Sequence, residues 1–169
     1  MGKAKRPKYC WDTSVFLAWM KAEEGAPLDD IAAVADEIDN GSADLIVPVT
    51  IYTEVLEAKH TRKEIEKFQL FLKRSNVQSV DTTVGIAQKA SEIRSRALKE
   101  RRKLKTPDAQ VIATAIIYGA DVLHSLDPDI VNLSGSRVVD GLRISSPLPI
   151  TGQQALPGVL SCEDDPEHR

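Results

Sequence analysis

Short apolar runs that alternate with segments of helical periodicity are the feature that most restricts the fold of this chain. Runs at residues 9–11, 45–47 and 122–124 are short and mostly apolar, as expected for strands covered on both faces. Between them, apolar residues recur at helical spacing, as in residues 28–38. Strands separated by helices usually pair in parallel, so the sequence predicts an α/β fold, a three-layer α/β/α sandwich around a mostly parallel sheet.

Local signals predict where several of these elements begin. Ser14 is expected to cap the helix that follows the first apolar run, and residues 61–64 fit the Ser/Thr-x-x-Glu capping box. Thr106 is expected to cap a helix with Pro107 in its first turn; this helix is apolar nearly all round and should be buried. Residues 137–139 are expected to form a last strand.

The composition indicates one domain in a reducing compartment. With 169 residues the chain can bury a core without disulfides, and its two cysteines, Cys10 and Cys162, make no disulfide framework. No stretch of about 18 uncharged apolar residues occurs, so we expect a soluble, cytoplasmic protein that does not enter membranes. We expect a basic lead-in at residues 1–8, the domain at 9–146 and a poorly ordered tail at 147–169.

Four acidic residues stand at junctions between the expected elements. They are Asp12 after a strand, Glu54 early in a helix, Asp108 at a helix start and Asp127 after a strand. In a parallel sheet these junctions share one edge, so the four carboxylates are expected to converge. Neighbouring carboxylates raise each other's pKa, and a hard divalent cation, Mg²⁺ or Mn²⁺, is the natural compensation.

Each acid also has a purely local interpretation. Asp12 is a suitable helix cap, Glu54 can simply face solvent, and Asp108 favours the positive end of a helix dipole. Asp127 precedes a proline, as in many turns, and Asp129 competes with it as the fourth acid. The shared placement of the four acids favours a common site over four separate local roles.

A site of this kind suits phosphodiester hydrolysis without a side-chain nucleophile. One or two bound cations can lower the pKa of a water molecule and stabilise both the attacking and leaving oxygens at phosphorus. Ser14 and Ser125 each lie two residues from a key aspartate. Their hydroxyls are candidates to hold a metal-bound water or the phosphate by hydrogen bonds.

A basic run adjoins the third acid in the sequence. Residues 99–105 hold five cations and one anion, and Arg94 and Arg96 extend the cluster. Cations near the end of a helix often only face solvent. Here they can instead bind a phosphate backbone that the carboxylates repel; the candidates are Arg101, Arg102, Lys103 and Lys105.

Four segments resemble, in order and spacing, the four motifs of PIN domains: WDTSV at 11–15, TEVL at 53–56, TPDAQVIATA at 106–115 and HSLD at 124–127. The resemblance covers residues 8–144 and implies the α/β/α sandwich of that family. It also implies that Asp12, Glu54, Asp108 and Asp127 bind Mg²⁺ or Mn²⁺ for RNA cleavage. The fourth motif departs from the usual form, with Leu126 and Ile130 in place of a polar and an aromatic residue.

The size and layout are most similar to prokaryotic VapC-type toxins. That likeness implies an endoribonuclease that a cognate antitoxin protein holds inactive, and a homodimer. A PIN domain can also act in RNA maturation or bind RNA or protein without catalysis. A receiver-like phosphoacceptor module is a further α/β alternative, but its acidic pair and its lysine after a later strand are not evident.

Overall fold

All five strands of the sheet run parallel. The structure is a computed structural model that describes residues 5–150. The strands pair in the order β3-β2-β1-β4-β5. Their bounds are β1 Lys8–Trp11, β2 Asp44–Pro48, β3 Val77–Val80, β4 Val122–His124 and β5 Ile144–Ser145. The expected parallel α/β fold is confirmed.

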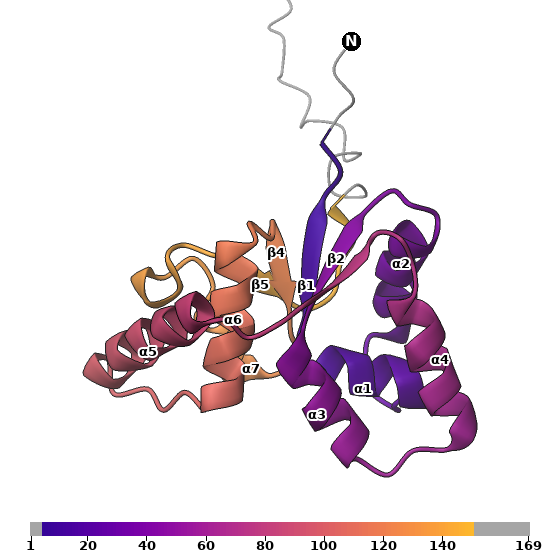
Figure 1. Cartoon of the computed structure of the whole chain (residues 1–169), viewed down its shortest axis with the longest axis horizontal. Coiled ribbons are helices and arrows are strands. Elements are labelled where there is room, and N and C mark those ends of the chain that lie inside the picture. The colour runs from indigo at the N-terminus through magenta and orange to yellow at the C-terminus, as the bar shows by residue number, and fades with distance from the viewer. Residues whose placement is uncertain (1–4, 151–169) are drawn as a thin grey trace, which may run out of the picture.

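Helices cover both faces of this sheet. They are α1 Thr13–Lys21, α2 Leu28–Asp39, α3 Val49–Glu57, α4 Arg62–Leu72, α5 Val84–Lys99, α6 Thr106–Ile117, α7 Pro128–Val131 and the 3-10 helix η1 Arg137–Val139. Figure 1 shows α1, α2 and α4 on one side of the sheet and α5 and α6 on the other. Helix α3 contacts both α1 and α6, so it lies at the edge of the sheet where the two helical layers meet.

The core is built around the central strand β1. Tyr9, Cys10 and Trp11 have no exposed surface, and the Trp11 ring packs against Phe16 at 5.2 Å and Phe71 at 5.7 Å between ring centroids. Each such side chain contributes about 1.5–3 kcal/mol by leaving water. In α6, residues 111–115 are all buried, which confirms the expectation that this helix is central.

The helix caps are partly as expected. The capping box of α4 is present, with Thr61 and Glu64 each accepting from the other's backbone N–H. Ser14 does not cap α1: Asp12 is the N-cap, and its carboxylate accepts from the N–H of Val15. Helix α6 includes Thr106 as its first residue, so the preceding lysine is the cap and provides no side-chain hydrogen bond.

The expected last strand at residues 137–139 was wrong. These residues form η1, and the true last strand is β5, which pairs with β4. The chain cannot extend here because Asp140 and Gly141 take left-handed φ angles of 52° and 78°. A hydrogen bond of 2.9 Å from the N–H of Gly141 to the carbonyl of Ser136 closes the turn.

Residues just outside both expected domain limits belong to the folded part of the chain. Lys8, expected in the basic lead-in, is the first residue of β1. At the other limit, the N–H of Ile150 donates to the Tyr9 hydroxyl at 2.9 Å, so the start of the expected tail packs on the core. The rest of that tail, with Cys162, and the first four residues lie outside the described part. Within residues 5–150, no helix is long and apolar enough to cross a membrane.

Candidate functional site

Four acidic residues come from separate elements to the carboxyl edge of the sheet. Asp12 follows β1, and its N–H donates to the carbonyl of His124 at the end of β4 at 3.1 Å. Asp127 follows β4, Glu54 lies in α3 directly after β2, and Asp108 lies in the first turn of α6. The negative charges of Asp12, Glu54 and Asp127 all act on Asp108. The four acids thus lie near enough for their charges to influence Asp108, and whether they form one site stays a prediction.

Asp12 is the most tightly held of these acids. Its side chain is only 9% exposed, and burial raises its pKa. Hydrogen bonds from the Ser125 and Ser14 hydroxyls and from the N–H groups of Val15 and Ser14 oppose this shift by stabilising the carboxylate. The Ser14 hydroxyl lies 2.5 Å from Asp12 Oδ1. Asp12 is thus fixed in one orientation at the end of the central strand.

Asp108 shows the electrostatic cost of the cluster most clearly. Burial, followed by the charges of Glu54, Asp12 and Asp127, raises its pKa to about 6, while Lys105 opposes the shift. At neutral pH the site therefore holds negative charge that its surroundings disfavour. A cation would relieve this repulsion.

Glu54 and Asp127 make hydrogen bonds within their own neighbourhoods. Glu54 Oε2 accepts from the Thr13 hydroxyl at 2.5 Å. Asp127 Oδ1 accepts from the N–H of Asp129 at 2.9 Å and so caps α7. Thr13 is not among the predicted site residues, because its partner is 41 residues away in the sequence and no local pattern indicates it.

The donor set has the chemistry of a hard cation site, without closed ligand geometry. Across residues 5–150, no group of three or more acidic, histidine or cysteine side chains is close enough to hold a metal ion. All four candidate ligands are carboxylates, which Mg²⁺ and Mn²⁺ prefer, and Mg²⁺ commonly keeps several water molecules between itself and the protein.

The two serines hold the protein's own groups. Ser14 donates to Asp12, and its oxygen accepts from the N–H of Leu126 at 2.9 Å. Ser125 has no exposed surface, and its oxygen accepts from the N–H of Asp127 at 3.1 Å. While these bonds persist, Ser14 has no hydrogen left to donate to a phosphate oxygen. Both hydroxyls link β1 to the segment that carries Asp127.

The basic run lies beside the acids. A cavity of about 670 Å³, here called the site cavity, has walls from the end of α5, the α5–α6 connection, the start of α6 and α7. Its charged lining residues are Arg101, Arg102, Lys103, Lys105, Asp108, Asp127 and Asp129. Asp127 and Asp129 both line it, and Asp127 is one of the groups that contribute most to the raised pKa of Asp108. Asp127 is therefore the better candidate for the fourth acid.

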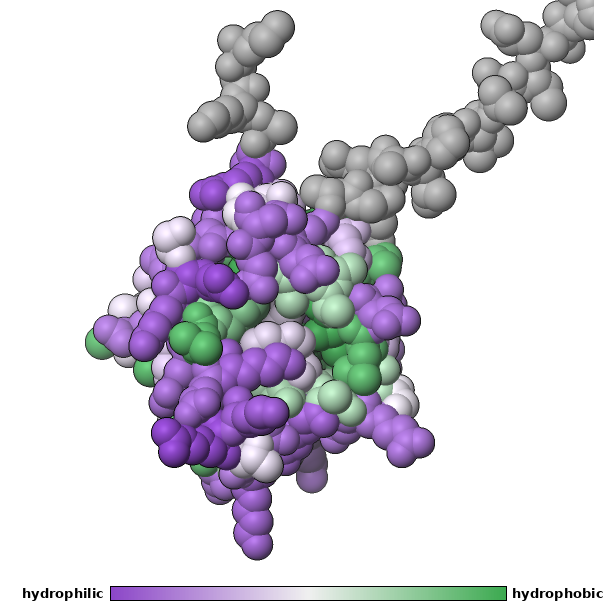
Figure 2. Space-filling view, turned by 90° about the vertical axis from the view of Figure 1, so that its right-hand side faces the viewer, coloured by the Kyte–Doolittle hydropathy of each residue, from purple (hydrophilic) through white to green (hydrophobic). Residues whose placement is uncertain are grey.

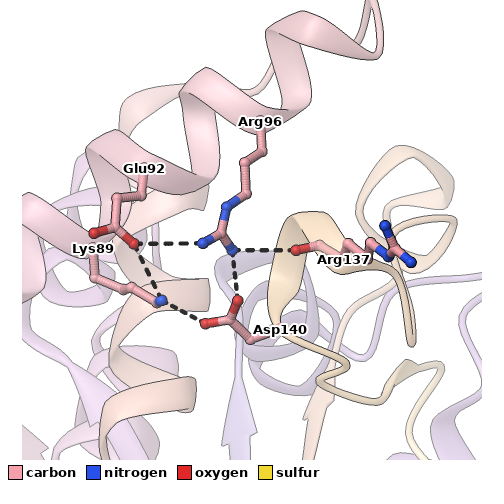
Figure 3. Close-up of polar contacts among 5 residues, drawn as sticks. All are labelled: Lys89, Glu92, Arg96, Arg137 and Asp140. Atoms are coloured by element: carbon pink, nitrogen blue, oxygen red, sulfur yellow. Dashed lines mark hydrogen bonds and ion pairs between the residues drawn. The ribbon is translucent and has the colours of Figure 1, made fainter.

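Arg96 does not extend the basic cluster as expected. Figure 3 shows it within an ionic network that joins α5 to η1. Its guanidinium contacts Asp140 at 2.5 Å and the Arg137 carbonyl at 3.2 Å, and Lys89 binds the same Asp140 carboxylate at 2.5 Å. The reason is helical geometry: Arg94 and Arg96 are two positions apart, so they point to different sides of α5.

Figure 2 views the molecule from the α1–α4 side and shows a mostly hydrophilic surface with apolar groups between the polar side chains. Glu54 lies on α3, which contacts both α1 and α6, and Asp108 lies on α6. The site therefore depends on the packing of the two layers against the sheet.

Comparison with known proteins gives one family match and several structural neighbours. A family model for the PIN domain matches residues 9–135. No curated protein sequence matches the chain significantly.

The structural neighbours share the fold at low sequence identity. VapBC2 from Rickettsia felis, bound to a promoter DNA fragment, has a TM-score of 0.60 and 13% identity over 82% of this chain and 98% of that one. VapBC-1 from nontypeable Haemophilus influenzae has a TM-score of 0.59 and 17% identity over 82% and 97%. VapC20 from Mycobacterium tuberculosis, a toxin that cleaves the sarcin-ricin loop, has a TM-score of 0.55 and 16% identity over 72% and 92%.

Proposed function

Since this chain belongs to the PIN domain family, we propose that it is a metal-dependent endoribonuclease, the toxin of a toxin–antitoxin pair. The observation that carries the proposal is the placement of the acids after β1, after β2, after β4 and at the start of α6, and the raised pKa of Asp108, about 6, supports it. A protein that needed these residues only as local caps would have no reason to concentrate their charge at one edge of the sheet.

Mg²⁺ or Mn²⁺ is the proposed cofactor, and Asp12, Glu54, Asp108 and Asp127 are its proposed ligands. The all-oxygen donor set and the destabilised charge on Asp108 support this assignment. When bound, the cation would supply a water of lowered pKa and charge stabilisation at phosphorus. Asp12 is already oriented for the task by the Ser14 and Ser125 hydroxyls, so we assign these serines a positioning role.

The substrate we propose is RNA, held by its backbone in the site cavity. Arg101, Arg102, Lys103 and Lys105 line this cavity together with Asp108 and Asp127, while Asp12 and Glu54 are not among its lining residues. Such positive charges attract phosphates without reading sequence. The acids would otherwise repel the same backbone. In this proposal the cations of the site cavity bind the RNA backbone, and the carboxylates take part in its hydrolysis.

We also propose an antitoxin protein as partner, a homodimer as the assembly and the cytoplasm as the location. Support for the partner comes from the neighbours of similar fold, several of which are VapBC complexes. A reading frame for a small antitoxin beside the gene for this chain would strengthen the proposal.

The first experiment is cleavage of a structured RNA pool by the purified full-length protein, with Mg²⁺ or Mn²⁺ and with chelator. Asp12→Asn and Asp108→Asn should each lower cleavage by at least about 100-fold, because each removes a carboxylate charge from the site. The fold should persist, since asparagine is also a good helix cap. Circular dichroism and mapping of the RNA ends provide the measurements.

A matched pair separates the two candidates for the fourth acid. Asp127→Asn should lose cleavage, whereas Asp129→Asn should retain it, because Asp127 is one of the main charges that raise the pKa of Asp108. Unchanged cleavage by Asp12→Asn and Asp108→Asn together would defeat the assignment. If the protein binds RNA but produces no new RNA ends that depend on the metal, it would instead be a non-catalytic PIN domain or one that acts in RNA maturation.

A further inference from the structure

A second groove lies on the other side of the segment that borders the site cavity. This α5 groove has a volume of about 590 Å³. It is lined by Ala87, Ala90, Ser91, Arg94, Ser95, Leu98, Arg102, Lys103, Leu104, Lys105, Thr106 and Gln110. Residues 102–105 also line the site cavity. The two hollows are therefore neighbours that share one wall.

The charge of the α5 groove differs from that of the site cavity. All of its charged lining residues are cations, whereas the site cavity contains three aspartates. Its remaining polar groups are the hydroxyls of Ser91, Ser95 and Thr106 and the amide of Gln110. Leu98, 69% exposed, adds an apolar surface. Cations, hydroxyls and an apolar surface suit the phosphates, sugars and bases of a nucleic acid strand.

The shared wall is held in place from both sides. Arg94 Nε donates to the carbonyl of Leu104 at 3.0 Å. On the other side, Arg102 Nη1 donates to the carbonyl of Asn132 at 3.1 Å, and the Arg102 N–H bonds the carbonyl of Ala97 at 2.9 Å. The cations of this wall are thus carried on a fixed backbone between the acids and the groove.

We propose that the α5 groove binds the single-stranded RNA segment that continues from the phosphate held in the site cavity. The strand passes over residues 102–105 and lies along α5, with its phosphates near Arg94 and the lysines of the wall. Ser91, Ser95 and Gln110 face its sugars and base edges, where a 2′-hydroxyl can both donate and accept. This inference rests on the proposed RNA substrate and adds a binding site outside the acidic centre.

The test is RNA binding by the full-length protein in chelator, where cleavage is not required. The probe is a labelled single-stranded RNA of mixed sequence, about 20 nucleotides long, followed by fluorescence anisotropy. Ser95→Glu places a negative charge in the groove and should weaken binding about 3- to 10-fold near 0.1 M salt; Ser95→Lys should strengthen it. Both effects should shrink at higher salt.

The matched control is Gln88→Glu, the same new charge on an exposed position of α5 that does not line the groove. It should change RNA affinity less than twofold. Equal affinities for Ser95→Glu and Gln88→Glu would overturn the proposal. A changed sedimentation coefficient of Ser95→Glu without a change in its RNA affinity would also overturn the proposal, since the groove would then be a protein interface. If Ser95→Glu weakens RNA binding but the wild type cleaves no RNA, the result supports the groove and rejects the nuclease.

Discussion

Asp108 is subject to opposing electrostatic influences. In the first turn of α6 the positive end of the helix dipole favours its ionised form. Burial and the charges of Glu54, Asp12 and Asp127 favour the protonated form, and the result is a pKa of about 6. The protein therefore gives up stability at neutral pH to keep this group charged, which is common where a residue serves function.

The sign of this effect is testable in chelator. Because the pKa of Asp108 is raised on folding, the folded state binds the proton more tightly, and stability falls as pH rises from about 4 to about 6. At pH 7.5, Asp108→Asn should be more stable than the wild type. Its free energy of unfolding should be higher by roughly 1 kcal/mol after discounting for solvent screening. The gain should vanish near pH 3.5, as measured by urea denaturation. An equal gain at both pH values would contradict the assigned pKa.

At the residue scale the sequence indicated where the acids lie in the fold but not the groups that hold them. Asp12 and Asp108 were recognisable by their places beside an expected strand and helix. The bond from Thr13 to Glu54 spans 41 residues, and the bond from Leu126 to Ser14 spans 112. Such contacts leave no local pattern, because they arise only when the sheet brings distant segments together.

Among the elements, α4 depends most clearly on its own first turn. The Thr61 hydroxyl accepts from the N–H of Glu64 at 3.3 Å, and Glu64 accepts from the N–H of Thr61 at 2.7 Å. Phe68 and Phe71, farther along the helix, pack into the core. The cap thus fixes the start of a helix that covers the sheet.

Removal of this cap has a predicted cost. Thr61→Ala should lower the free energy of unfolding by about 1 kcal/mol, since the Glu64 N–H would lose its acceptor. Thr82→Ala, at an exposed threonine outside the helices, is the matched control and should change it by less than about 0.5 kcal/mol. Thermal unfolding of the two variants checks this. Equal melting temperatures would mean that the capping box contributes nothing measurable.

At the element scale, periodicity predicted the central elements better than the peripheral ones. Strands β1, β2 and β4 are buried on both faces and read as apolar runs. Residues 137–139 have the same apolar character, with Val138 and Val139 buried, yet form η1. Burial alone does not distinguish a strand from a 3-10 turn, and the left-handed φ of Asp140 that decides the matter has only a following glycine as its sequence signal.

In the whole molecule, the network in Figure 3 ties η1 and the turn after it to α5, which lines the α5 groove. Lys89 and Arg96 on α5 both bind Asp140, and hydrogen bonds from them lower the pKa of Asp140. The contribution of the ionised Asp140 to stability is therefore full above the ordinary aspartate pKa and is lost as pH falls below that value.

Asp140→Asn should remove this charge without disturbing the turn, because asparagine tolerates the left-handed conformation. We expect a loss of roughly 0.5 kcal/mol at low salt, since the groups are largely exposed. The loss should diminish in 1 M salt and disappear in a Lys89→Ala, Arg96→Ala background. Urea denaturation at two salt concentrations measures it. A loss that does not depend on salt would assign the effect to the turn instead.

At this largest scale the sequence predicted the architecture but not the arrangement within it. Alternating strands and helices were enough for a parallel sandwich. The strand order and the α5 groove were not predictable, because both depend on which segments meet in space. The groove in particular needs the bend at Arg101, whose φ of 59° brings the basic run back against α5.

The central position of β1 has a consequence for the order in which the protein is made. Its neighbour β4 leaves the ribosome long after β1 does, and the amide of Asp12 finds the carbonyl of His124 only then. During most of its synthesis the nascent chain therefore lacks one of the two neighbours of β1 at the sheet edge that carries Asp12. The order of the strands in the sheet thus makes completion of this edge a late event, whatever the order in which the other elements form.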